Sequence, residues 1–248
     1  MQPFEGQTAI VTGASSGIGR AVALTLARQG AAVALHARRD AALQAVADEI
    51  RRGGGRALAV AGDAGQADAL DTLLDAVLAW REGGCAYTIV VANAGRGLAG
   101  GITTSDASQW QELYQTNVMG TAHLLRQTGR YLSQRGGGDI VVISSVVGRN
   151  ISPFSGFYGS SKFAVSALAE ALRREVCAAG VRVSTVLPGI VESGFQQVAG
   201  YTRENFGKTV EAYGKVLEPQ DIANGVAWLL AQPPHVHVSE IMIRPTGQ

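Results

Sequence analysis

The chain predicts an α/β fold in which a doubly wound parallel sheet of about seven strands carries helices on both faces. Two observations support this prediction. Short apolar runs alternate with amphipathic helical segments along all 248 residues, an order typical of parallel strands joined by crossover helices. A glycine-rich turn also follows the first apolar run directly. No linker, repeat or low-complexity tract interrupts residues 1–248, so we expect a single domain.

The first elements form a βαβ unit. Residues 8–12 and 32–36 are apolar runs that predict strands, and residues 20–29 between them have helical spacing. Such a unit is right-handed and is the building block of a Rossmann fold. The alternation then continues, with helices expected over 41–52 (Asp40 as N-cap), 66–80, 106–134, 158–179 and 220–231, and strands over 57–61, 88–92, 140–143, 181–187 and 240–243.

The composition excludes several function classes. A net charge of +1 without a long basic run does not predict a nucleic-acid-binding surface. No apolar stretch reaches the roughly 18 residues of a membrane span, and the N-terminus lacks the pattern of a signal peptide. Two cysteines, Cys85 and Cys177, are too few for a disulfide framework and indicate free thiols in a reducing compartment. We therefore expect a cytoplasmic protein that binds neither nucleic acid nor membrane.

The first turn is the predicted nucleotide site. Glycines at 13, 17 and 19 permit backbone conformations and close approaches that a Cβ would block. The free amides at the start of the following helix, around Ile18 and Gly19, can face an anion such as a pyrophosphate. The alternative is a tight turn without a ligand. Its place directly after the first strand of an alternating chain favours a dinucleotide.

The end of the second strand indicates which dinucleotide. An acidic residue there would bind the ribose 2′-hydroxyl and repel a 2′-phosphate, but Ala37 occupies the place and Arg38 and Arg39 follow. A guanidinium binds phosphate through bidentate, charge-assisted hydrogen bonds. We therefore expect NADP(H), although Asp40 lies close by. The alternative is two solvated arginines on a loop.

A tyrosine and a lysine follow the fifth strand. Tyr158 and Lys162 are four residues apart at the start of a helix, so they share one helix face. A free phenol has a pKa of about 10, and a nearby ammonium is expected to lower the pKa of Tyr158 and make it a useful proton donor and acceptor. Ser145 stands at the strand end, thirteen residues before the tyrosine. Two surface residues on a helix are the alternative.

These motifs resemble those of the short-chain dehydrogenase/reductase family along essentially the whole chain. The matching segments are residues 12–19 (TGASSGIG) for the cofactor motif, 93–95 (NAG) after strand four, Asn117 in a helix, Tyr158 with Lys162, and Pro188-Gly189 beside the nicotinamide. The resemblance implies an NADP-dependent carbonyl reductase that transfers a hydride between NADP(H) and a ketone, aldehyde or secondary alcohol. It also implies a homo-oligomer, either a tetramer or a dimer.

The resemblance also implies roles for the catalytic residues. Ser145 would bind the substrate carbonyl, and Ser144 would be structural. Tyr158 would donate or accept the proton. Lys162 would hold the nicotinamide ribose and depress the tyrosine pKa, and Asn117 would hold a water that links Lys162 to solvent.

The expected cofactor-binding residues come from loops along the whole chain. Asp63 would meet the adenine, Asn93 the adenosine ribose, and Val191 with Ser193 the carboxamide. The full set is Gly13, Ser15, Ser16, Gly17, Ile18, Gly19, Arg38, Arg39, Asp63, Ala64, Asn93, Ala94, Gly95, Tyr158, Lys162, Pro188, Gly189, Val191 and Ser193. Two positions depart from the family pattern, because Ala92 stands where a second asparagine is frequent and Ser16 where many NADP-preferring relatives carry an arginine.

The substrate is less well defined by the sequence. Residues 190–216 lack a clear pattern and are expected to form a mobile region over a substrate cleft. Arg96 or Arg149 could pair with an acidic group on the substrate, or each could be a solvated loop residue. Apolar and aromatic residues are expected to line the pocket, namely Leu98, Val147, Phe154, Phe157, Phe195, Tyr201 and Phe206.

The sequence also offers three alternatives to an NADP-dependent reductase. A non-catalytic NADP-binding regulator or scaffold is disfavoured, because the whole catalytic set is present. A sugar-nucleotide epimerase or dehydratase would need a longer C-terminal substrate domain than the segment after Gly189 provides. A metal site at His235 and His237 would need more ligands than these two, so no metal is expected.

Overall fold

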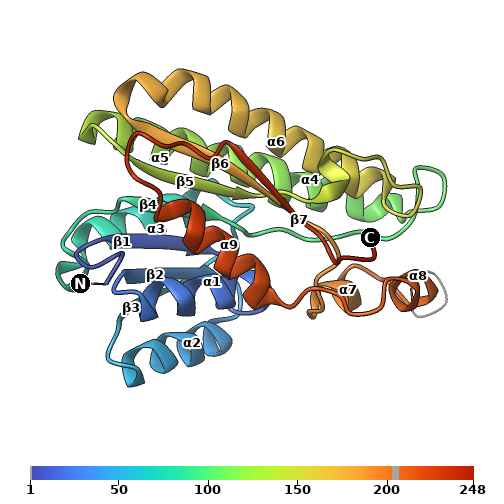
Figure 1. Cartoon of the computed structure of the whole chain (residues 1–248), viewed down its shortest axis with the longest axis horizontal. Coiled ribbons are helices and arrows are strands. Elements are labelled where there is room, and N and C mark those ends of the chain that lie inside the picture. Colours follow the sequence, from blue (N-terminus) through green and yellow to red (C-terminus); the bar gives the residue numbers. More distant parts are fainter. Residues whose placement is uncertain (1, 203–206) are drawn as a thin grey trace.

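The computed structural model describes residues 2–202 and 207–248, and its centre is a seven-stranded sheet in the order β3-β2-β1-β4-β5-β6-β7 (Figure 1). All neighbouring strands pair in parallel. The strands are β1 (Thr8–Thr12), β2 (Ala32–Ala37), β3 (Arg56–Ala61), β4 (Ile89–Ala92), β5 (Gly138–Ile143), β6 (Val181–Pro188) and β7 (Glu240–Ile243). This arrangement confirms the predicted doubly wound parallel sheet.

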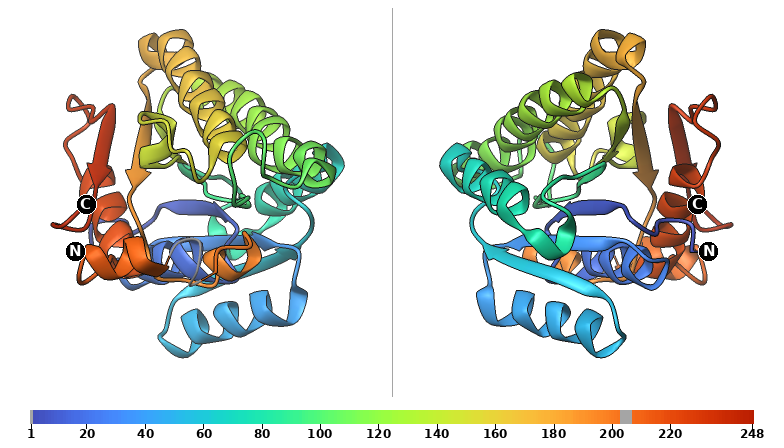
Figure 2. Two further views of the ribbon diagram at one scale, coloured as in Figure 1. Left: turned by 90° about the vertical axis from the view of Figure 1, so that its right-hand side faces the viewer. Right: turned by 90° about the vertical axis from the view of Figure 1, so that its left-hand side faces the viewer.

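Helices cover both faces of the sheet, as expected (Figures 1 and 2). One face carries α1 (Gly17–Arg28), α2 (Asp40–Arg52) and α9 (Pro219–Leu230), and the other carries α3 (Ala67–Ala79), α4 (Trp110–Tyr114), α5 (Thr121–Arg135) and α6 (Gly156–Val176). Strand β1 shows why these strands are apolar throughout. Ala9 and Val11 belong to the core under α1, α2 and α9, whereas Ile10 belongs to the core under α3, α5 and α6, because successive side chains point to opposite faces.

The helical region expected over 106–134 is confirmed, since helical backbone runs without a gap from Ala107 to Arg135, but it is irregular in a way that the sequence does not predict. A short 3₁₀ turn (Ala107–Gln109) leads into α4, and a π-helical turn (Gln115–Gly120) separates α4 from α5. A Cβ on Gly120 would collide with the carbonyl oxygen of Ala64, so the backbone of the π turn packs directly on the loop after β3. A π turn accommodates one extra residue per turn and leaves no mark in the apolar spacing of the sequence.

The region 190–216 contains two short helices, α7 (Phe195–Val198) and α8 (Lys208–Ala212). An isolated bridge joins Val191 to Leu217 at its base. Residues 203–206, which include the expected pocket residue Phe206, lie outside the described residues. The mobility of the region stays a prediction.

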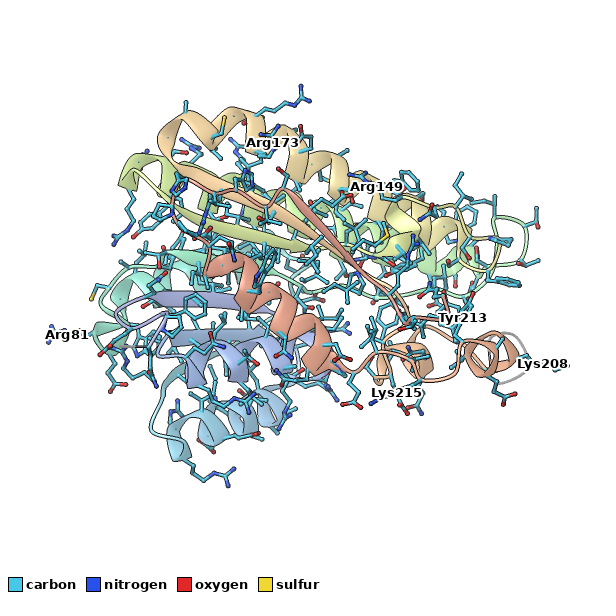
Figure 3. The ribbon with its side chains drawn as sticks, viewed as in Figure 1. Arg81, Arg149, Arg173, Lys208, Tyr213 and Lys215 are labelled. Carbon is cyan, nitrogen blue, oxygen red and sulfur yellow. The ribbon has the colours of Figure 1, made fainter. Side chains whose placement is uncertain are left out.

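The carboxyl ends of the strands meet at one edge of the sheet, beside α7 and α8 (Figure 1). Strand β1 lies between β2 and β4. The chain leaves β1 toward α1 on one face and leaves β4 toward α4 on the other. At a reversal of this kind, α/β sheets form a ligand-binding crevice outside the carboxyl ends of the strands, so we expect the crevice here. Arg81, in the connection before β4, marks the opposite end of the molecule (Figure 3).

Candidate active site

The glycine turn is locked to the loop after β4. The Thr12 hydroxyl accepts hydrogen bonds from the backbone N–H groups of Asn93 (3.1 Å) and Ala94 (3.0 Å). The Asn93 side-chain amide donates to the Thr12 carbonyl at 2.9 Å. A Cβ on Gly19 would collide with the Gly13 carbonyl oxygen. The turn therefore requires glycine for its packing, and its position is fixed by the neighbouring strand.

The N-terminus of α1 presents free backbone amides at this turn. Gly13 and Gly17 have positive φ angles of 66° and 53°, which glycine adopts without strain. In the described chain the N-cap Ser16 makes no side-chain bond to the helix, and the first turn holds no acidic residue. The amides at the start of α1 can therefore bind an anion, since the helix dipole favours negative charge there.

Tyr158 lies in the first turns of α6 and is buried. Its hydroxyl faces the Ser145 side chain. Burial raises the pKa of Tyr158 above its ordinary value, the nearby Tyr201 adds to the rise, and the Ser145 side chain opposes it. The pKa shift is therefore opposite to the lowering expected from the sequence, because desolvation of the phenolate is the largest effect.

Lys162 lies one helical turn further along α6, and its side chain is also buried. Its Nζ is 5.8 Å from the centre of the Tyr158 ring and donates a hydrogen bond of 2.9 Å to the carbonyl of Ile143, the last residue of β5. Burial lowers the pKa of Lys162 to about 8, since an ammonium loses its hydration in the interior. The lysine is thus held beside the tyrosine by the strand end.

Asn117 lies in the π turn and is only 1% exposed. Its Oδ1 accepts from the backbone N–H of Arg96 (2.8 Å), and its Nδ2 donates to the Arg96 carbonyl (2.9 Å) and to the Ser161 hydroxyl (3.0 Å). A Cβ on Gly95 would lie 3.2 Å from Asn117 Oδ1 and 3.6 Å from Lys162 Nζ. The structure therefore brings the asparagine and the lysine to the same backbone segment after β4.

Two serines directly follow strand β5, and their hydroxyls have different partners. The Ser145 hydroxyl faces Tyr158 and also lies near the Val147 N–H (3.3 Å). The Ser144 hydroxyl is buried and bonds to the Lys162 carbonyl (3.1 Å) and the Ser166 hydroxyl (2.8 Å). Ser144 thus anchors α6 to the sheet, as expected for a structural residue, and Ser145 faces the site.

The segment after β6 faces the glycine turn. Pro188 ends the strand, and Gly189 follows it closely packed against Pro245 and Gln248. A Cβ on Gly17 would lie 3.6 Å from the Ser193 Cβ. Val191 is buried, and its carbonyl accepts from the Gln196 side chain at 2.5 Å. The segment expected at the carboxamide is therefore next to the first turn.

The residues expected at the adenosine line the ends of β2 and β3. Asp63 Oδ1 accepts from the Gly65 N–H at 2.9 Å, and Ala64 packs against Gly120. Arg39 Nη2 lies 3.5 Å from the Ser15 hydroxyl. Arg38 extends toward α4, with its Nη1 3.8 Å from a Glu112 oxygen. Both arginines therefore border the crevice.

The two arginines considered for an acidic substrate already have carboxylate partners. Arg96 contacts Glu112 and donates to Gln109 Oε1 at 2.5 Å. Arg149, in the connection from β5 to α6, forms an ion pair with Glu240 of β7 at 2.5 Å (labelled in Figure 3). Arg96 is only 15% exposed and is not a solvated loop group, whereas Arg149 is an exposed loop residue in spite of its ion pair. Each would have to exchange a partner to bind a substrate.

Aromatic rings lie around Tyr158. Phe195 lies 5.7 Å from Tyr158 between ring centres, and Trp110 stacks on Phe157 at 4.3 Å. Leu98 and Val147 belong to the same apolar cluster. The sequence analysis did not identify Trp110, Glu112 or Ser161 as residues of the site. Ser161 follows Tyr158 by three residues, so its helical spacing was the signal that could have identified it.

Residues 2–202 and 207–248 contain no helix long and apolar enough to cross a membrane. They also contain no group of three or more His, Cys, Asp or Glu side chains arranged to hold a metal ion. Cys85 and Cys177 are free and exposed.

Comparisons with protein families and with known proteins both find oxidoreductases. The family model for short chain dehydrogenases matches residues 7–204. Over 245 residues the chain is 34% identical to an uncharacterized oxidoreductase of Staphylococcus epidermidis, covering 99% of this chain and 100% of that protein.

Solved structures agree along nearly the whole length. An alcohol dehydrogenase from the archaeon Thermococcus sibiricus, complexed with 5-hydroxy-NADP, superimposes with a TM-score of 0.84 at 31% identity, covering 98% of this chain and 97% of that one. A metagenomic short-chain oxidoreductase in complex with NADP has a TM-score of 0.81 at 33% identity, covering 98% of this chain and 99% of that one.

Proposed function

The chain belongs to the short-chain dehydrogenase family, and from this we propose that it is an NADPH-dependent carbonyl reductase that can also oxidise secondary alcohols. One observation carries the proposal. Ser145, Tyr158, Lys162 and Asn117 converge at the carboxyl edge of the sheet, beside the glycine turn at the start of α1.

The residues of the crevice fit a dinucleotide. The backbone at Gly13, Gly17 and Gly19 leaves room that a Cβ would fill, and the amides of α1 would hold a pyrophosphate. Asp63 would hold the adenine at one end, and Ser193 would hold the carboxamide at the other. When bound, NADPH supplies the hydride, which adds to the carbonyl carbon of the substrate.

The four converging side chains would handle the proton and the developing charge. The Ser145 hydroxyl would donate to the substrate oxygen, where negative charge develops during reduction. Tyr158 would give its phenolic proton to the same oxygen. Because burial raises the pKa of Tyr158, the phenol form needed for reduction is the dominant one at neutral pH. Lys162 would hold the nicotinamide ribose and keep a positive charge beside the phenol. Asn117 would hold the loop after β4 in place.

We assign the preference for NADP(H) to Arg38 and Arg39. Both border the crevice after β2, and Ala37 offers no carboxylate to a ribose 2′-hydroxyl. An arginine there can bind a 2′-phosphate in a bidentate manner. Two structural relatives were solved in complex with 5-hydroxy-NADP or NADP, which supports the assignment.

Replacing Tyr158 with phenylalanine tests the proposed chemistry. The variant keeps the ring and its packing but has no proton to transfer, so turnover of any accepted ketone should fall by at least about a hundredfold, while NADPH binding measured by titration calorimetry persists. Tyr131→Phe is the matched control, because Tyr131 stacks on Tyr87 at 4.2 Å, away from the site. Unchanged turnover in Tyr158→Phe would refute the role of the phenol.

The same assay addresses the alternative of a non-catalytic NADP-binding regulator. A wild-type protein that binds NADPH but reduces no member of a broad panel of ketones and aldehydes would support that alternative. The first accepted compound would indicate the class of substrate, and assays with the matching alcohol and NADP would give the direction of the reaction. We further propose that the protein is a homo-oligomer, a tetramer or a dimer.

A further inference from the structure

Glu112 of α4 joins two arginines that come from different strand ends. One of its carboxylate oxygens lies 3.8 Å from Arg38 Nη1, and the other contacts the Arg96 guanidinium. Arg38 follows β2 and Arg96 follows β4, and these two strands flank β1 in the sheet. The two ion pairs therefore cross from one border of the crevice to the other.

The two pairs differ in how firmly they are held. The Arg96 side chain is only 15% exposed and has Gln109 as a second partner at 2.5 Å. The Arg96 backbone is bound on both sides by Asn117. The Arg38 side chain is 61% exposed, and its distance to Glu112 exceeds that of a hydrogen bond. Glu112 is thus fixed at its Arg96 end, and Arg38 is the partner that can move.

We propose that Glu112 is a positioning residue that limits the preference for NADP(H) over NAD(H), because it competes with the 2′-phosphate for Arg38. The proposal rests on the proposed function. A phosphate offers Arg38 bidentate, charge-assisted hydrogen bonds, and Arg38 must leave Glu112 to form them. NAD(H) carries a hydroxyl in place of the phosphate, so its binding leaves the Arg38–Glu112 pair in place. Arg39, beside the Ser15 hydroxyl, is the second phosphate contact.

Dissociation constants of NADPH and NADH test the proposal without any substrate. Titration calorimetry is carried out on the wild type, Glu112→Gln, Arg38→Ala and the double variant, with thermal unfolding as the check on folding. Glu112→Gln should bind NADPH about two- to fivefold more tightly, the range for an exposed ion pair, and NADH with little change. In the Arg38→Ala background the same substitution should change neither constant.

Two additions locate the effect. Asp48→Asn removes the same charge from an exposed arginine pair on α2, where Asp48 lies 2.9 Å from Arg51, and it should leave both constants unchanged. Adenosine 2′,5′-bisphosphate, which has no nicotinamide, should reproduce the gain seen with NADPH, and adenosine 5′-monophosphate should not.

Each other result has a definite meaning. No gain for NADPH in Glu112→Gln, an equal gain for NADPH and NADH, or a gain that persists without Arg38 overturns the role of Glu112. A wild type that binds neither dinucleotide refutes the proposed function instead. A wild type that prefers NADH refutes only the proposed NADP preference, and the comparison between variants still decides the role of Glu112.

Discussion

Lys162 is a cationic group in a buried position, and this placement links its charge to the stability of the fold. The pKa of Lys162 is lowered from 10.5 to about 8 by burial. Between these two values the unfolded chain binds a proton that the folded chain has lost. The contribution of Lys162 to the free energy of unfolding therefore rises with pH between about 8 and 10.5, and it levels off below 8, where both states carry the proton.

This linkage predicts a difference between the wild type and Lys162→Met. From pH 8 to 9.5 the wild type should gain roughly 2 kcal/mol of unfolding free energy relative to the variant. Urea unfolding at several pH values measures it, and the difference between the two proteins cancels the contribution of other titrating groups. Parallel curves for the two proteins would show that the ammonium of Lys162 is not desolvated.

At the scale of elements, the π turn positions more than Asn117. Gly120 ends this turn against the Ala64 carbonyl, and Gln115 of the same turn donates a hydrogen bond of 2.6 Å to the Gly65 carbonyl. The loop after β3, which holds the proposed adenine contact Asp63, therefore rests on the backbone of the π turn. One irregular turn thus aligns Asn117, a proposed catalytic residue, with the proposed cofactor loop.

Gly120→Ala tests this coupling. The added methyl group overlaps backbone, which cannot rotate away, so we expect a loss of about 1–3 kcal/mol in unfolding free energy together with weaker NADPH binding. Gly53→Ala is the matched control, because the nearest atom to its Cβ would be at 3.4 Å, an ordinary contact, and its effect should stay within about 0.5 kcal/mol. Loss of stability with unchanged NADPH affinity would separate the turn from the cofactor loop.

The elements also show what a sequence can and cannot predict. Parallel strands covered on both faces are continuous apolar runs, so strands such as β4 and β5 could be predicted from the hydrophobic pattern alone. The spacing of Tyr158 and Lys162 is local and was equally visible. The π turn was not visible in the sequence, because its residues are of the same types as those of an ordinary helix and its extra residue leaves no mark in the apolar spacing. The Arg38–Glu112–Arg96 contacts join residues far apart in the chain, and burial of Tyr158 reverses a pKa shift inferred from its charged neighbour alone.

For the whole molecule, the surface of α5 and α6 supports the proposed oligomer. These helices border a groove of about 560 Å³ on the face opposite α2 (Figure 2). Small and apolar residues line it, namely Ala122, Leu125, Gly129, Leu168, Ala171, Leu172 and Val176, together with Arg126, Arg130 and Glu175. In a two-fold pair of copies, the arginines on α5 of one can face the carboxylate on α6 of the other, which is the self-complementarity an isologous interface needs.

Ala171→Arg is the substitution that tests this interface. Ala171 is exposed on α6 at the groove, where a long charged side chain would prevent close helix packing and repel the arginines of the facing α5. We expect the wild type to sediment as a dimer or tetramer and the variant to shift toward smaller species, with its fold retained by circular dichroism. Ala45→Arg, at an exposed position of α2, should leave the assembly intact. A monomeric wild type would show that the proposed interface does not form, and an unchanged assembly in Ala171→Arg would place the interface elsewhere. Neither result would affect the proposed catalytic site, whose residues all come from one chain.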